Sequence, residues 1–351
     1  MIYLMFFICF LIAFGLTPLV KKLAIRIGAT DVPNARKVHT HIMPRMGGVA
    51  IYLAFITGML VLWPESSFTV PLLLGSIIII ITGILDDLYS LSAKVKIVAH
   101  FFAALVIVNG GISVAFINLP FDGVLYLNWL SVPLTLLWIM GITNAINLID
   151  GLDGLAAGVS SIVLLTIAGL SLTEGNMFVF TVSTVLLGST LGFLPFNFHP
   201  AKIFMGDSGA YFLGYIISVL ALLGFKNITL FSLVVPIIIL AVPISDTLFA
   251  IVRRMVNKKP LSAPDKSHLH HCLLRFGFSQ RQTVTLIYGM SAMFALAAIL
   301  LSSSTLLGSL LIIVLVMFTI ELVVEIVGLV SANYKPLLNA YKRIMSLGKV
   351  K

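Results

Sequence analysis

The stretch from Asn144 to Gly158, NAINLIDGLDGLAAG, places four polar side chains between two long apolar segments. They follow one another at intervals of three residues: Asn144, Asn147, Asp150 and Asp153. Because each helical residue advances by about 100°, the first and the last of them would point to opposite sides of a straight helix. Glycines stand at positions 151 and 154. The sequence therefore predicts a helix that ends near Leu148, followed by a glycine-containing loop that brings these groups together.

The chain on either side of this stretch is strongly apolar. Of its 351 residues, 60% are hydrophobic and only 10% are charged, whereas soluble domains are about 45–50% apolar. Apolar runs long enough, or nearly long enough, to cross a bilayer cover about residues 3–20, 47–63, 70–85, 97–111, 130–146, 155–172, 177–195, 211–223, 230–252, 284–301 and 306–330. The sequence predicts an all-α, polytopic integral membrane protein with about eleven transmembrane helices.

The basic residues predict the orientation of these helices. With the N-terminus outside, the inner segments are about 21–46, 86–96, 144–154, 195–210, 253–283 and 331–351, and they contain every Lys and Arg except Lys226. Since positive residues are retained on the cytoplasmic side, the C-terminus is expected in the cytoplasm. The same pattern accounts for the net charge of +9 without nucleic acid. No internal repeat is visible, so we expect one membrane domain over residues 1–351, in the plasma membrane.

An acidic pair follows directly on the third apolar run. Asp86 and Asp87 are adjacent there, and Lys94 and Lys96 come within ten residues. Ionisable groups at such a depth are costly and usually functional. Two solvated carboxylates that cap the next segment are the alternative. Carboxylates facing lysines favour the handling of a metal or of an anionic substrate.

The other inner segments also carry polar groups. Asp207 lies in a glycine-rich turn before an apolar run, where it could present its carboxylate or simply cap a helix. The largest inner loop contains His268, His270 and His271 among basic residues. Zinc is one interpretation of this cluster, but structural zinc sites usually add cysteines at set spacing and Cys272 is alone, which favours hydrogen bonds to a diphosphate. The basic first loop is either a topology anchor or an anion-binding loop.

These side chains share one predicted membrane face, and their chemistry is consistent. Carboxylate and amide oxygens are the hard ligands that magnesium prefers, with water or substrate phosphate completing the shell. Basic groups would hold a polyanion. The combination predicts phosphoryl transfer between a cytosolic reactant and a lipid.

Five motifs, in order from about residue 30 to residue 275, resemble the polyprenyl-phosphate N-acetylhexosamine-1-phosphate transferase family. They read DVPNARKVH with PRMGG, DD followed by LSAKVK, NAINLIDGLDGLAAG, NFHPAKIFMGDSGA and PDKSHLHH. They resemble most the Gram-positive branch that starts wall teichoic acid linkage units. That resemblance implies transfer of N-acetylglucosamine 1-phosphate from UDP-N-acetylglucosamine to undecaprenyl phosphate, with release of UMP. A homodimer is compatible with the family.

The resemblance also implies roles for particular residues. Asp207 and Asn147 would ligate Mg²⁺, for which Mn²⁺ could substitute. Asp86 would orient the lipid phosphate, supported by Asp87, with Lys96 as a positive charge. The nucleotide and sugar pocket would contain Asp150, Asp153, Asn197, Arg254, His268, His270 and His271. A phosphate-binding loop would contain Arg36, Lys37 and His39. Relatives commonly carry a third aspartate where this chain has Ser90, so no role is carried over to that position.

Two other functions remain open from the sequence. The sibling branch, which transfers phospho-N-acetylmuramoyl-pentapeptide in peptidoglycan synthesis, shares the aspartates but is usually described with ten spans. A nucleotide-sugar transporter would also have many helices and intramembrane charge. Transport sites, however, lie near the bilayer midplane and often between internal repeats, whereas these polar groups collect on one face.

Overall fold

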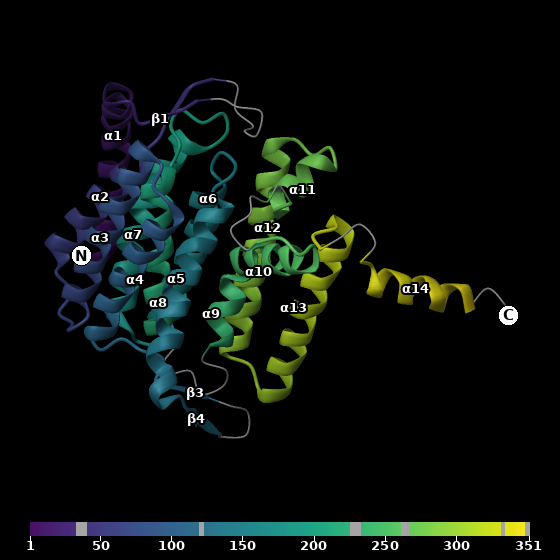
Figure 1. Ribbon diagram of the computed structural model, residues 1–351. Helices are drawn as coiled ribbons and strands as arrows, with labels where there is room; N and C mark the ends of the chain where they lie inside the picture. Colours follow the sequence, from purple (N-terminus) through teal and green to yellow (C-terminus); the bar gives the residue numbers. More distant parts are fainter. Residues whose placement is uncertain are drawn as a thin grey trace.

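The computed structural model describes residues 1–32, 41–118, 123–224, 233–260, 265, 267–330 and 334–347. Regular structure in these ranges is almost entirely helical (Figure 1). The helices are α1 (Ile2–Ile27), α2 (Gly47–Leu62), α3 (Thr69–Tyr89), α4 (Ala93–Asn109), α5 (Ser131–Ile149), α6 (Leu155–Thr173), α7 (Met177–Asn197), α8 (Gly206–Gly224), α9 (Val234–Ile239), α10 (Ala241–Val256), α11 (Leu269–Arg275), α12 (Gln280–Ser302), α13 (Leu306–Val327) and α14 (Pro336–Leu347). Two antiparallel strand pairs complete the fold, β1 (Thr30–Asp31) with β2 (Met43–Pro44) and β3 (Phe116–Asn118) with β4 (Val124–Tyr126).

The prediction of an all-α integral membrane protein is confirmed. Eight helices in the described ranges are long and apolar enough to cross a membrane, namely α1, α3, α5 with the short turn before it, α6, α7, α8, α12 and α13. Helix α2 is apolar but has only 16 residues. The total of about eleven spans and the side on which each terminus lies stay predictions.

One predicted span differs from the structure. The apolar run expected over about residues 230–252 is not one continuous helix in its described part, because α9 ends at Ile239 and α10 begins at Ala241. Pro243 has no N–H to donate to the carbonyl of Ile239, so the helical hydrogen-bond ladder is interrupted at Leu240. Figure 1 shows α10 turned across the direction of α9. After this bend, α10 runs to the chain segment that precedes α11.

Helix α8 forms the centre of the bundle, and all of its residues except Asp207 are buried. It packs against α2, α3, α5, α6 and α7. Two glycines on neighbouring helices permit backbone contact at its first turn. A Cβ on Gly48 would lie 2.0 Å from the backbone N of Gly209, and one on Gly83 would lie 2.3 Å from the Cα of Ser208. The backbone around Asp207 is therefore tightly fixed between α2 and α3.

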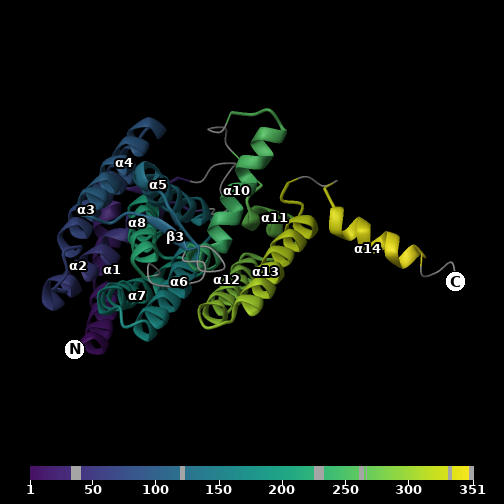
Figure 2. The same ribbon diagram turned by 90° about the horizontal axis from the view of Figure 1, so that it is seen from below.

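The chain segments between helices gather at opposite ends of the bundle. Figure 1 shows β1 and α11 at one end and the β3–β4 pair at the other. Both views show α14 leading away from the bundle (Figures 1 and 2). Its first turn is attached through buried Glu325 of α13, whose carboxylate accepts the N–H groups of Leu337 and Leu338.

Candidate active site

A cavity of about 550 Å³ lies where α5 ends and α8 begins, next to the β1–β2 pair and α11. It thus lies at helix ends and not in the middle of the bundle. Six of the residues predicted from the sequence line it: Asn147, Asp150, Asp153, Asn197, Asp207 and His271. The structure thus brings together side chains that are up to about 120 residues apart in the chain.

Asp207 is placed in this cavity by Asp87, which caps the first turn of α8. One carboxylate oxygen of Asp87 accepts the N–H of Asp207 at 2.8 Å. The other accepts the N–H of Ser208 at 3.1 Å and its hydroxyl at 2.7 Å. Gly206, with a φ of 76°, makes room, because a Cβ there would lie within 2.5–2.9 Å of the Asp87 carboxyl group. Asp87 therefore caps α8 from another helix, so Asp207 is not the cap and its carboxylate is directed into the cavity.

Asp86 lies behind Asp207 and is fully engaged. It is 1% exposed. Its carboxylate accepts the N–H of Leu91 at 2.8 Å and the hydroxyl of Tyr211 at 2.9 Å, and it pairs with the Lys96 ammonium at 2.6 Å. The Lys96 side chain is partly exposed. The two predicted catalytic aspartates therefore face α8 and Lys96, and neither lines the cavity.

The opening stretch of sequence folds much as expected. Helix α5 ends at Ile149, one residue beyond the predicted position, and Gly154 has the positive φ of 76° that a turn into α6 requires. Asn147, in the last turn, donates its side-chain amide to Asp207 Oδ1 at 2.7 Å. Asp150 follows the helix. Burial, then the negative charges of Asp207 and Asp87, raises the pKa of Asp150 to about 8.

Asp153 also lines the cavity and holds the segment that follows α7. Its Oδ2 lies 2.8 Å from His199 Nδ1 and accepts the N–H of Ala201 at 3.1 Å. Asn197 donates its side-chain amide to the carbonyl of Ile203 at 3.1 Å. The Oδ1 of Asn197 is buried and has no hydrogen-bond partner within the described chain. An unpaired buried oxygen is costly, so a donor supplied by a ligand would be favoured at Asn197.

Of the three predicted histidines, only His271 lines the cavity. The ring of His270 packs on Gly151, where a Cβ would lie 2.3 Å from its Nε2. His268 Nδ1 lies 2.9 Å from Asp246 Oδ2 on α10. Burial, followed by His268 and Arg275, lowers the pKa of His271, so its imidazole is neutral at pH 7.

Of the four other predicted residues, the structure describes only Arg254. Arg254 is on α10 and does not line the cavity; its Nε is buried and has no partner within the described residues. The predicted phosphate-binding loop lies outside the described residues: Arg36, Lys37 and His39.

Sequence reasoning left several cavity residues out of the site. Asp31 and Arg45 both line the cavity, with Arg45 Nη2 3.4 Å from Asp31 Oδ1. Phe204 also lines the cavity. Arg45 belongs to the PRMGG motif and Phe204 to IFMGDSG, so both lay within stretches already singled out. Only the fold shows that these two motifs meet, as Phe204 N–H donates to the carbonyl of Pro44 at 2.8 Å.

The cavity residues fit a magnesium ion that takes few protein ligands. No three His, Cys, Asp or Glu side chains in the described ranges are grouped closely enough to hold a metal alone. Asp150 and Asp207 nevertheless face the same cavity with the side chain of Asn147, and repulsion disfavours the ionisation of both carboxyl groups together. A divalent cation would relieve that repulsion. Magnesium typically uses one or two carboxylates and completes its shell with water and substrate phosphate.

Comparison with known proteins supports the family that the five motifs resemble. The family model of glycosyl transferase family 4 matches residues 69–225. The chain is 52% identical, over 97% of its length and 96% of the relative's, to the probable undecaprenyl-phosphate N-acetylglucosaminyl 1-phosphate transferase of Bacillus subtilis. It is 38% identical to the decaprenyl-phosphate N-acetylglucosaminephosphotransferase of Mycolicibacterium smegmatis, over 79% of this chain and 76% of that one.

A more distant relative extends the comparison. The undecaprenyl-phosphate alpha-N-acetylglucosaminyl 1-phosphate transferase of Thermotoga maritima is 31% identical over 82% of this chain and 86% of its own. The family predicted from the five motifs is thus confirmed. The chain belongs to glycosyl transferase family 4, among the membrane-embedded transferases that move an N-acetylhexosamine 1-phosphate onto a polyprenyl phosphate.

Proposed function

We propose that this protein transfers N-acetylglucosamine 1-phosphate from UDP-N-acetylglucosamine to undecaprenyl phosphate. The products are undecaprenyl-diphospho-N-acetylglucosamine and UMP. The observation that carries the proposal is the cavity where α5 ends and α8 begins, at which carboxylates, amides and histidines converge. The relative with 52% identity carries the name of this activity.

The reaction needs little acid–base catalysis. An oxygen of the lipid phosphate attacks the phosphorus next to the sugar, the bond to the UMP oxygen breaks, and UMP leaves with the electron pair. Because the second pKa of a phosphate monoester is about 6, the acceptor is largely dianionic at pH 7. Alignment and neutralisation of charge therefore dominate.

The residues divide into two groups around this reaction. Asp207 and Asn147 would hold Mg²⁺, or Mn²⁺ in its place, and the ion would neutralise charge on the donor diphosphate. Asp87 fixes the backbone of Asp207 and so positions this carboxylate. Asp150 and Asn197 belong to the wall that would receive the nucleotide.

The acceptor phosphate requires a positive charge. Asp86 is enclosed by Lys96, Tyr211 and the backbone of Leu91. It therefore acts on the lipid through Lys96, whose ammonium it orients and whose side chain is partly exposed. A point charge of this kind suits a terminal phosphate.

We further propose that the site faces the cytoplasm and that the product starts wall teichoic acid. The distribution of Lys and Arg supports the first proposal, and the motif resemblance supports the second. The transporter alternative is less favoured, because the cavity lies at helix ends, while transport sites lie near the midplane.

The test compares two sugar donors, each supplied separately to the protein in detergent or nanodiscs. Purified protein is incubated with Mg²⁺, undecaprenyl phosphate and either UDP-N-acetylglucosamine or UDP-N-acetylmuramoyl-pentapeptide, and UMP is measured. We expect UMP to be released only with UDP-N-acetylglucosamine. Release only with the muramoyl donor would assign the sibling reaction, and counterflow of the nucleotide-sugar across vesicles without UMP would assign transport.

A further inference from the structure

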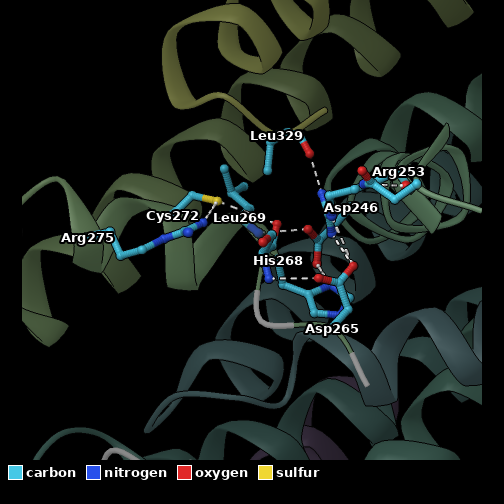
Figure 3. A network of polar contacts seen from close by, with 10 residues as sticks. Asp246, Arg253, Asp265, His268, Leu269, Cys272, Arg275 and Leu329 are labelled. Carbon is cyan, nitrogen blue, oxygen red and sulfur yellow. Dashed lines mark hydrogen bonds and ion pairs between the residues drawn. The ribbon is translucent and has the colours of Figure 1, made fainter. Parts of the chain in front are cut away.

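Asp246 is a buried acid that lies on α10, outside the cavity. It is 2% exposed. Both of its carboxylate oxygens bind the start of α11 (Figure 3): Oδ2 lies 2.9 Å from His268 Nδ1, and Oδ1 accepts the N–H of Leu269 at 2.7 Å. A carboxylate this deeply buried is costly unless it is fully paired. Asp246 thus caps α11 and holds the residue before it.

A second contact on α10 holds the preceding segment. Arg253, two turns further along, donates to Asp265 Oδ2 and to the backbone carbonyl of Leu329, which follows α13. Asp265 Oδ1 accepts the N–H of Ser267 at 2.9 Å. Figure 3 shows both contacts on one side of α11. The segment that enters α11 is therefore attached to α10 at two points.

The orientation of α11 decides where its histidines point. The helix has only seven residues, and a helix so short is not stable by itself. With its N-terminus fixed by Asp246, His270 faces Gly151 and His271 faces the cavity. A rotation of α11 by about 100°, the angle between adjacent helical residues, would turn His271 away from the cavity.

We propose that Asp246 is a positioning residue for the transfer reaction. It fixes the start of α11 through His268 and the Leu269 N–H, and thereby keeps His271 directed into the donor cavity. The attachment of α11 follows from the contacts alone. Its importance for transfer rests on the proposed function.

The first measurement reports the attachment without any turnover. The chain contains two cysteines, and Cys272 on α11 is 1% exposed. In a Cys9→Ala background, labelling by a polar maleimide reports Cys272 alone. We expect slow labelling in this background and a rate at least about tenfold higher after Asp246→Ala, since loosening of α11 by local opening exposes its buried face.

Thr247→Val is the matched control for this labelling. Thr247 is the next residue on α10, and its buried hydroxyl has no hydrogen-bond partner within the described chain. The substitution keeps the shape of the side chain, so slow labelling and full activity are expected. Protection of Cys272 in Asp246→Ala equal to that in the control would overturn the proposal.

The second measurement is a double-mutant cycle with His271→Ala. A displacement of about 1 Å can cost about 100-fold in rate, so we expect kcat/KM for UDP-N-acetylglucosamine to fall by about that factor in Asp246→Ala. Because Asp246 acts through His271, Asp246→Ala should add little to the loss in His271→Ala. Losses that multiply would mean that Asp246 acts by another route and would overturn the proposal.

Asp246→Asn separates positioning from folding. It keeps the volume and one oxygen for the Leu269 N–H, but it replaces the acceptor that faces His268 with an amide. We expect this variant to have a labelling rate and a kcat/KM between those of the parent protein and those of Asp246→Ala. Parental values for both quantities would refute the role of the His268 contact. A parent protein that releases no UMP would refute the proposed function, while the labelling would still decide whether Asp246 fixes α11.

Discussion

Replacement of Gly151 by alanine tests whether contact between the Asp150 loop and α11 sets the geometry of the site. The backbone of Gly151 lies outside the left-handed region, so alanine is acceptable there on conformational grounds. The added Cβ would lie 2.3 Å from Nε2 and 2.7 Å from Cε1 of His270. An ordinary contact is about 3.5 Å, so the ring must retreat by about 1.2 Å.

The ring of His270 has little room to retreat. It is 3% exposed, stacked on His268 at 6.0 Å between ring centroids and tilted against His271 at 4.2 Å. The displacement is therefore passed along α11 to His271. We expect Gly151→Ala to lower stability by about 1–3 kcal/mol, as overpacking does, and to lower kcat/KM by about 10- to 100-fold.

The assay measures UMP release over a range of UDP-N-acetylglucosamine concentrations, beside thermal unfolding in the same detergent. Gly141→Ala is the control, because it lies on α5 with no atom within 4 Å of its added Cβ. Gly151→Ala combined with His270→Ala should regain activity over Gly151→Ala alone, since removal of the ring restores the space. Parental kcat/KM in Gly151→Ala would refute the proposed contact between the loop and α11.

Three further substitutions test individual carboxylates. Asp207→Asn should abolish UMP release in the presence of Mg²⁺ with little change in thermal unfolding, and full activity would exclude Asp207 as a metal ligand. Asp87→Ala leaves donors of Asp207 and Ser208 unpaired, and each unpaired donor costs about 1–3 kcal/mol of stability. The melting temperature should therefore fall by several degrees. A parental melting temperature would contradict the role of Asp87 as the cap of α8. The pKa of Asp150 is raised from 3.8 to about 8, so between these values the folded chain binds a proton that the unfolded chain does not. Metal-free stability should therefore fall from about pH 4 to pH 8, and Asp150→Asn should flatten that fall in thermal unfolding with EDTA.

The positions of most helices could be predicted from the sequence because apolar length is a local property. The end of α5 was predicted to within one residue from the spacing of polar groups and glycines. The break at Leu240 was not predicted, although Pro236 and Pro243 within the apolar run were available as signals. Tertiary contacts decide whether such prolines bend a helix or are accommodated in it.

The division of roles within the site required the fold. From the sequence, the carboxylates were expected together on one face. That Asp87 caps α8 and that His270 packs on Gly151 could not be predicted, because these partners are 120 and 119 positions apart. Asp246 could have been singled out, since it is an acid within an apolar run. Its role as the cap of α11 depends on the bend before α10.

The separation between Asp87 and its partners has a consequence for biosynthesis. Within the described residues, its hydrogen-bond donors come from Asp207 and Ser208, about 120 residues later in the chain. Helix α3 is therefore made and delivered to the membrane well before α8 exists. In that interval the Asp87 carboxyl group must remain in contact with water or be protonated, since a bare charge in hydrocarbon is costly. Arrival of α8 ends this exposure and fixes the backbone of Asp207 in the same step, so the placement of this carboxylate depends on the pairing of α3 with α8.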